Sequence, residues 1–303
     1  MSERGKATEQ APKPKMPEAE KRRLTRFYLI AFAWTWALWI PSLVWSARTG
    51  IALPTMEAGY AAWSELSGVG LVFAVTFQLA VYGPLIAAFV MLVSAKRGGA
   101  GSELRDWKAS LVKFRVAPGW WAFVLLWPLA LGVLVTLVST IAGGGGVPRF
   151  SASAVLGSIP LLFAVQMLTS GLEEPGWRGF ALPLLQRTHN AENASWYLGL
   201  VWAAWHLPYV VYLNRAAPVW TLPLTIAGFA MAIIAMGYVH AWVYNSTGSV
   251  LLNIVLHAWA NVVNMTIALI QPNPLTPVVL AVLTWLFVAW LMRRYGKDRL
   301  AVE

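Results

Sequence analysis

Three charged side chains interrupt an apolar segment of this chain, at about 155–185. They are Glu173, Glu174 and Arg178. A carboxylate or guanidinium at membrane depth costs about 2.5–3.5 kcal/mol on insertion scales. Charges placed so close together in such a segment therefore need partners, and they usually mark a functional site.

Helical spacing separates the roles of the two glutamates. Glu174 and Arg178 are at positions i and i+4, so they share one face of a helix and can form an ion pair. Glu173 lies about 100° around the helix and is free to face another group. Pro175 removes one backbone hydrogen-bond donor, so we expect the helix to kink or open beside the acids.

Two other apolar segments carry polar side chains that could meet Glu173. In segment 196–213, Trp202 and His206 are at i and i+4 on one face. In segment 249–270, steps of four, four and three residues place a polar stripe on one face. The stripe consists of Asn253, His257, Asn261 and Asn264. In a bilayer we expect such a stripe to point into the helix bundle.

Matched depth would allow these groups to form one site. The rise of a helix puts Glu173, His206 and His257 at roughly 12–21 Å from the cytoplasmic side. One carboxylate and two imidazoles can hold a zinc ion with an open position for water. They can also act without a metal, as a base and an acid on water. Asn261 could donate an amide hydrogen to an oxyanion. The alternative is that these polar side chains only tie helices together.

Two other features are expected at the membrane surface. His240 falls near the cytoplasmic end of its apolar segment, where an interfacial position is expected for it. The segment 95–118 is basic and partly amphipathic through Trp107, Leu111 and Phe114, which indicates a surface-lying helix.

Composition places the chain among polytopic membrane proteins. Hydrophobic residues make up 58% of it and charged residues 12%, a balance that is unusual for a soluble domain. The chain has no cysteine, which excludes disulfides and thiolate metal sites. Its net charge of +10 could indicate nucleic acid binding. The basic residues flank the apolar segments, however, so we interpret the charge as an orientation signal and expect no nucleic acid partner.

The apolar segments predict an all-α fold, a polytopic bundle of about eight transmembrane helices in one domain at 26–295. Residues 1–25 are expected to form a disordered cytoplasmic tail and residues 296–303 a second cytoplasmic tail. The expected spans are approximately Phe27–Trp45, Val69–Ser94, Trp120–Ile141, Val155–Leu185, Trp196–Leu213, Val219–Tyr244, Ser249–Ile270 and Leu275–Met292.

Lysine and arginine counts give the orientation. Nineteen of the 23 basic residues fall in the N-terminal tail, in 95–118, after the fourth span or at the C-terminus, and three fall in the alternate loops. The positive-inside rule then puts both termini in the cytoplasm. We expect an integral, multi-pass protein of a bacterial plasma membrane.

Three short stretches resemble one family of membrane proteins. EEPGWRGF, starting at Glu173, resembles the EExxxR motif of the CPBP family, the CAAX protease and bacteriocin-processing membrane endopeptidases. WAAWHLP resembles its second motif, an aromatic residue followed by His206. HAWAN resembles its third, His257 followed by Asn261. The similarity covers about 120–270. At Trp202 this chain departs from the best-known members, which have phenylalanine.

The resemblance implies an intramembrane endopeptidase that cuts a peptide or protein substrate near the cytoplasmic face, in the manner of a CAAX prenyl protease. It implies that Glu173 and His206 activate water and that His257 and Asn261 complete the site. Glu174, Arg178 and Trp202 would support them. A divalent metal is possible, and Glu173, His206 and His257 match the ligand set of zinc. Two alternatives stay open: a catalytically silent bacteriocin-immunity or scaffold protein, and a proton-coupled transporter.

Overall fold

The computed structural model describes residues 15–55, 66–97, 101–143 and 152–302, and every regular element in these ranges is helical. The α-helices are α1 (Glu18–Thr49), α2 (Val69–Leu79), α3 (Gly83–Arg97), α4 (Gly101–Leu111), α5 (Pro118–Ile141), α6 (Ala152–Leu168), α7 (Glu174–Gly176), α8 (Leu182–Gln186), α9 (Ala191–Trp205), α10 (Leu207–Leu213), α11 (Leu222–Thr247), α12 (Val250–Ile270) and α13 (Thr276–Tyr295). Short 3₁₀ turns span Ala80–Tyr82, Ser170–Glu173 and Val219–Thr221, and a π-helical turn spans Trp177–Ala181.

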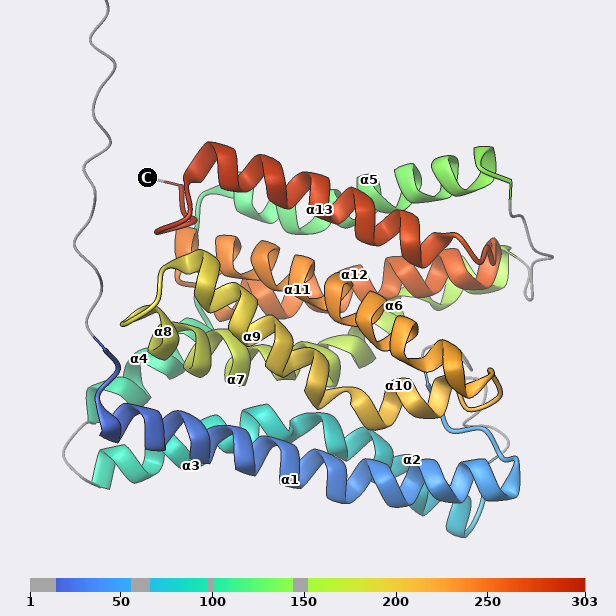
Figure 1. Ribbon diagram of the computed structural model, residues 1–303, viewed down its shortest axis with the longest axis horizontal. Helices are drawn as coiled ribbons and strands as arrows, with labels where there is room; N and C mark the ends of the chain where they lie inside the picture. The colour runs from blue at the N-terminus through green and yellow to red at the C-terminus, as the bar shows by residue number, and fades with distance from the viewer. Residues whose placement is uncertain (1–14, 56–65, 98–100, 144–151, 303) are drawn as a thin grey trace, which may run out of the picture.

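The helices form a bundle in which the charged motif is central. The N-terminal helix α1 packs along α2 and α3 on one side, and α5 and α13 lie together on the opposite side (Figure 1). Between these sides α9 packs on α11, and α12 packs on α5 and α6. The short α7, which begins at Glu174, contacts both α3 and α12. The motif therefore lies where the two sides of the bundle meet.

Seven helical stretches of the described chain are long and apolar enough to cross a membrane. They are Glu18–Thr49, Val69–Ala95, Pro118–Ile141, Leu156–Gln186, Val219–Thr247, Val250–Ile270 and Thr276–Tyr295. These confirm the predicted polytopic all-α bundle. The fifth expected span, Trp196–Leu213, is present as two shorter helices, α9 and α10, interrupted at His206. Pro208 explains the interruption, because proline lacks a backbone N–H and clashes with the preceding turn.

Both ends of the described chain lie at the same end of the bundle (Figure 1). Ion pairs join basic segments there: Arg187 lies 2.6 Å from Glu20, and Arg23 pairs with Glu103 on α4. The hydrogen bond from Arg23 holds the pKa of Glu103 below its usual value. A chain that crosses the membrane an even number of times must have both ends on the same side, as found here. That this end faces the cytoplasm stays a prediction.

Two segments differ from their expected positions. Helix α1 begins at Glu18, inside the segment 1–25 that was expected to be a disordered tail; residues 1–14 of that tail lie outside the described residues. Helix α4 does not rest on lipid through Trp107. That side chain is buried in the protein, and its indole N–H donates to the carbonyl oxygen of Pro175 at 2.9 Å. The carbonyl beside the charged motif thus gains a partner from α4.

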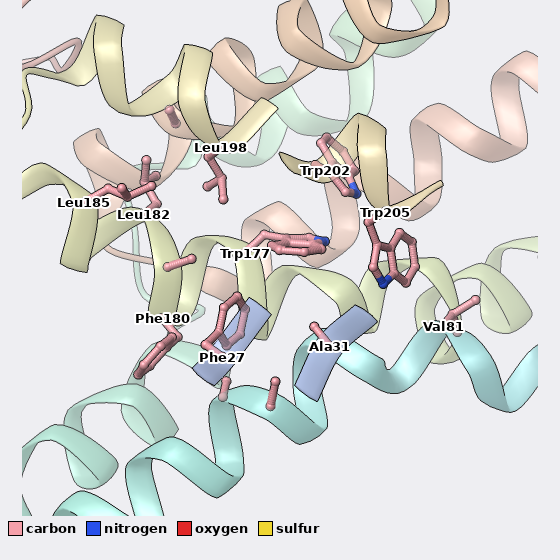
Figure 2. Close-up of a cluster of buried hydrophobic side chains, with 14 of the residues drawn as sticks. Phe27, Ala31, Val81, Trp177, Phe180, Leu182, Leu185, Leu198, Trp202 and Trp205 are labelled. Atoms are coloured by element: carbon pink, nitrogen blue, oxygen red, sulfur yellow. The ribbon is translucent and has the colours of Figure 1, made fainter. Parts of the chain in front are cut away.

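Buried aromatic rings surround the motif and fix its position (Figure 2). Trp177 is fully buried, and its ring contacts Phe27 of α1 at a centroid distance of 5.6 Å and Trp205 of α9 at 6.0 Å. A built Cβ on Gly176 would collide with the backbone of Pro84 at the start of α3. Only glycine allows this close approach, which holds α7 against α3.

A tight turn brings α11 and α12 side by side. Gly248 ends α11 in the left-handed conformation, with φ at +61°, where glycine has no steric penalty. Ser249 then caps α12 by accepting a hydrogen bond from the backbone N–H of Leu252 at 3.1 Å. Residues at similar distances before and after this turn become neighbours in the antiparallel pair. His240 and His257 are two such residues.

Candidate active site

The charged motif occupies a break in helical structure between α6 and α8. The backbone passes from a 3₁₀ turn ending at Glu173 through α7 into the π-helical turn 177–181. Pro175 is one cause of the break, because it cannot donate a helical hydrogen bond. The predicted opening of the helix beside the acids is confirmed. A π-helical turn is also common at functional sites.

Glu174 belongs to a buried ionic network. Its side chain is 0% exposed, and Nη1 of Arg178, itself 1% exposed, lies 3.1 Å from both carboxylate oxygens. Nδ1 of His257 lies 2.8 Å from Oε1 of the same carboxylate. Nδ1 of His240 lies 3.7 Å from Oε2. The predicted pair of Glu174 with Arg178 is confirmed, with two histidines as further neighbours.

Glu173 has different partners, although its side chain is also only 3% exposed. Its Oε2 accepts a hydrogen bond of 2.8 Å from the indole N–H of Trp202 on α9. A longer contact of 3.4 Å comes from the indole N–H of Trp177 to the same oxygen. Neutral indole donors therefore hold this carboxylate in place. The expectation that Glu173 faces a group other than Arg178 is confirmed.

His206 occupies the break between α9 and α10. It ends α9, and Pro208 in the first turn of α10 prevents a continuous helix. Its Nδ1 lies 2.8 Å from the carbonyl oxygen of Trp202, one turn earlier. The break leaves the imidazole partly exposed, whereas Trp202 is buried.

Asn261 lies one turn after His257 on α12 and is bound by a residue of α6. Its amide nitrogen donates to Oε1 of Gln166 at 3.0 Å. Gln166 is buried at the end of α6, shortly before the charged motif. The contact uses one of the two amide hydrogens of Asn261, and the second can serve a ligand.

A single cavity of about 1190 Å³ connects the predicted site residues. Its polar lining includes Glu173, His206, His240, His257, Asn261 and Asn264. Trp202 also lines it, whereas Glu174 and Arg178 do not. Most of the remaining wall is apolar, from residues such as Phe229, Val278 and Leu286. The volume is at or above the upper end of ordinary ligand pockets, so the cavity has room for an extended or lipidated chain.

Two comparisons with known proteins bear on this site. Residues 155–263 match a family described as type II CAAX prenyl endopeptidase, Rce1-like. The chain is also 25% identical over 198 residues to CAAX prenyl protease 2 of Methanococcus maripaludis, covering 62% of this chain and 70% of the relative. The two comparisons support the CPBP, or CAAX protease, family for this chain. The range 155–263 contains all three motifs.

His240 is an additional histidine of the cavity lining that the sequence did not indicate. The expectation of an interfacial position for it is wrong, because the side chain is 0% exposed. Its Nδ1 lies 2.8 Å from Oδ1 of Asn253, whose amide nitrogen donates to the carbonyl oxygen of Ser249. The turn at Gly248 was the available signal, since His240 and His257 lie at nearly equal distances from it along the chain.

The three cavity histidines have the same hydrogen-bond pattern. Each Nδ1 lies 2.8 Å from an oxygen: that of Trp202 for His206, Asn253 for His240 and Glu174 for His257. Since these oxygens are acceptors, each Nδ1 carries the hydrogen in the neutral ring, and each Nε2 keeps a lone pair. Nε2 is the atom on which each ring can accept a proton or a hydrogen bond.

A group that could hold a metal ion is present, and it is not the predicted trio. Ligand atoms of Glu174, His240 and His257 lie within 4.8 Å of one another, and of the predicted ligands only His257 belongs to this group. Glutamate and two histidines suit zinc by donor type. Each of these residues already has a protein partner, however: Arg178 for Glu174, Glu174 for His257 and Asn253 for His240. Within the described residues, Oε2 of Glu174 and Nε2 of His240 accept no hydrogen bond, but a metal ion bound there would lie beside the guanidinium of Arg178.

Proposed function

We propose that this chain is an intramembrane endopeptidase of the CAAX prenyl protease type, in which Glu173 and His206 activate the attacking water. The observation that carries the proposal is the division of the two glutamates. Arg178 neutralises Glu174 outside the cavity lining, while Glu173 lies on the cavity wall with His206, His257 and Asn261. A carboxylate that is not paired with a cation, and that faces a cavity, can act as a general base.

The proposed reaction uses Glu173 to carry one proton. Glu173 takes the proton from water as the water oxygen attacks the carbonyl carbon of the peptide bond. His206 accepts a hydrogen bond from the same water at Nε2. When the carbon–nitrogen bond breaks, Glu173 returns the proton to the leaving amine. The immediate products are a carboxylic acid and a neutral amine, so atoms and charge balance. The acid then loses a proton and the amine gains one, which gives the carboxylate and the ammonium group of the released peptides.

Two residues of α12 would stabilise the intermediate. Asn261 can donate its second amide hydrogen to the oxyanion, since Gln166 binds the first. His257, whose ring is oriented by the 2.8 Å contact of its Nδ1 with Glu174, can accept a hydrogen bond at Nε2 from the hydroxyl group of the intermediate. Glu174 would therefore serve the reaction indirectly, through His257.

The substrate class follows from the cavity and from the relative. The relative is called a CAAX prenyl protease, and the cavity of this chain combines one polar region with a long apolar wall. We propose a substrate with a prenylated cysteine near its C-terminus, whose isoprenoid chain contacts the apolar wall. Cleavage would occur near the cytoplasmic face.

The test is cleavage of a synthetic farnesylated peptide ending in a CAAX sequence by the purified full chain in detergent. We expect release of the last three residues, loss of activity in Glu173→Gln and His206→Ala, and weaker cleavage of the unprenylated peptide. Near-normal activity in His206→Ala would contradict the hydrolase mechanism. A silent scaffold protein would instead keep its biological role in Glu173→Gln, and a transporter would show proton-coupled uptake in liposomes.

Orientation has its own test, made simple by the absence of cysteine. Single cysteines at Ser102, at the start of α4, and at Thr49, at the end of α1, should react with a membrane-impermeant reagent from opposite sides. Labelling of both from the same side would overturn the proposed topology, in which Ser102 is cytoplasmic.

A further inference from the structure

Trp202 contacts several residues of the candidate site, although the proposed reaction gives it no part. Its indole N–H binds Glu173, and its ring face lies 4.3 Å from the guanidinium carbon of Arg178. The ring also lies 5.5–6.0 Å, between centroids, from all three cavity histidines. Those histidines are His206, His240 and His257. Trp202 is 3% exposed and lines the cavity, so it stands between the carboxylate at its edge and the cation over its face.

The edge of the ring fixes one oxygen of Glu173. The 2.8 Å hydrogen bond goes to Oε2, and the weaker 3.4 Å contact from Trp177 goes to the same atom. Hydrogen bonds to an ionised carboxylate are stronger than those between neutral groups. Because both indoles bind Oε2, the other oxygen, Oε1, can bind the water. A phenylalanine at position 202 would keep a ring there but would have no hydrogen to donate.

The face of the ring restrains Arg178. A guanidinium within about 6 Å of a tryptophan face is attracted by the ring electrons. Nη1 of Arg178 binds Glu174, and its Nε is buried without a hydrogen-bond partner. An arginine with unused donors beside two glutamates could turn to Glu173 and neutralise it. The ring of Trp202 attracts the guanidinium of Arg178 in the position where Arg178 pairs with Glu174.

We propose that Trp202 is a positioning residue that keeps the two adjacent glutamates in different roles. Its N–H orients the carboxylate of Glu173 towards the water, and its face holds Arg178 on Glu174. The backbone carbonyl oxygen of Trp202 also sets the tautomer of His206, through the 2.8 Å contact with Nδ1. This inference rests on the proposed function, because the orientation matters only if Glu173 is the base.

The kinetic test compares three tryptophan variants in the full chain. Trp202→Phe keeps a ring and removes the N–H, and we expect kcat on the farnesylated CAAX peptide to fall about 10- to 100-fold, with KM within about threefold. Trp177→Phe removes the 3.4 Å contact and should lower kcat less. Trp259→Phe is the control, because its N–H donates to the carbonyl oxygen of Leu125 at 2.8 Å, outside the cavity lining.

A second substitution separates the hydrogen bond from the shape of the ring. Benzothienylalanine at position 202 has the bicyclic shape of tryptophan and no N–H, so we expect the same loss of kcat as in Trp202→Phe, with an unchanged unfolding temperature. If both variants are folded and retain kcat within threefold, the positioning role is wrong. Full activity with benzothienylalanine and low activity with phenylalanine would also overturn it, since shape alone would then explain the loss.

A spectroscopic test does not depend on the substrate. In the full chain labelled with ¹⁵N-tryptophan, the indole resonance that is missing in Trp202→Phe belongs to Trp202. We expect Glu173→Gln to move this proton resonance upfield, because a neutral amide oxygen is a weaker acceptor than a carboxylate. The Trp259 resonance should not move. An unmoved Trp202 resonance would refute the inference. A shifted resonance in a protein that cleaves no peptide would instead refute the proposed function and leave the hydrogen bond established.

Discussion

Glu173 and Glu174 are adjacent in the chain, yet their carboxylates lie in two differently built regions. The first region, called here the cavity layer, consists of Glu173, His206 and Asn261 along the cavity wall. The second, the ionic network, consists of Glu174 and Arg178, which do not line the cavity, and their neighbours His240 and His257, which do. In the cavity layer the carboxylate is held by neutral indole donors. In the ionic network the carboxylate has a cation 3.1 Å away.

The difference shows how a membrane protein can keep one carboxylate reactive. A charge buried in a low-dielectric interior needs a partner, and the partner that stabilises it also reduces its ability to take a proton. Here Arg178 compensates one of two negative charges, and tryptophan donors hold the other. If this interpretation is correct, substitutions in the cavity layer should lower activity, and substitutions in the ionic network should lower the stability of the fold.

The largest expected effect comes from removing the base of the cavity layer. Glu173→Gln keeps the shape of the side chain and should lower peptide cleavage by about 10²–10⁴-fold or more, the range of general-base catalysis. Its unfolding temperature should stay near the wild-type value, since no ion pair is broken. Cleavage of the farnesylated peptide and thermal unfolding in detergent would be measured on the same preparation.

Glu174→Gln is the matched variant one residue away. It should destabilise the protein and also slow peptide cleavage. The substitution leaves Arg178 without a charged partner and weakens the contact to His257. Should Glu173→Gln unfold the protein while Glu174→Gln is stable but inactive, the two regions have exchanged roles.

Breaking the ionic network from its other side should cost stability. Arg178→Ala leaves the carboxylate of Glu174 buried without its cation, which costs about 3–5 kcal/mol in comparable buried pairs. The double variant Glu174→Leu with Arg178→Leu should recover much of this loss, because no charge is left unpaired. Arg187→Ala is the control: its ion pair with Glu20 is half-exposed, so the change should be about 1 kcal/mol or less. Denaturant unfolding of the wild type and these three variants would give the values. Equal costs for Arg178→Ala and Arg187→Ala would contradict the network.

A smaller effect is expected for the oxyanion donor of the cavity layer. Asn261→Ala should reduce kcat by about 10²–10³-fold, as for other side-chain donors of this kind. Asn245→Ala is a suitable control, because its amide binds the carbonyl oxygen of Arg299 and does not line the cavity. If Asn261→Ala raises KM with kcat unchanged, the residue binds substrate and does not stabilise the intermediate.

Much of the fold was predictable from the sequence. The lengths of the apolar segments indicate the helices that span the membrane, and the charges of the loops predict their orientation. The division between the glutamates was also predictable, since the i, i+4 spacing of Glu174 and Arg178 survives the break in the helix. The position of His240 was not, because it depends on how the turn at Gly248 pairs α11 with α12. The hydrogen bond from Trp202 to Glu173 joins residues on different elements, and spacing within one segment cannot show it.

The smallest effect is expected from metal removal, and it decides whether the ionic network is a stabilising element or a metal site. Glu174, His240 and His257 have suitable donors, but these residues already contact Arg178, Asn253 and one another. A dication placed there would lie beside the guanidinium of Arg178, and like charges repel strongly at low dielectric. We therefore expect chain dialysed against a chelator to cleave the farnesylated peptide at the same rate, and His240→Gln to retain most of its activity. Elemental analysis of the purified chain should find less than one zinc per molecule. Loss of activity in chelator, with recovery on adding zinc but not in His240→Gln, would assign a metal to the ionic network and make Glu174 its ligand.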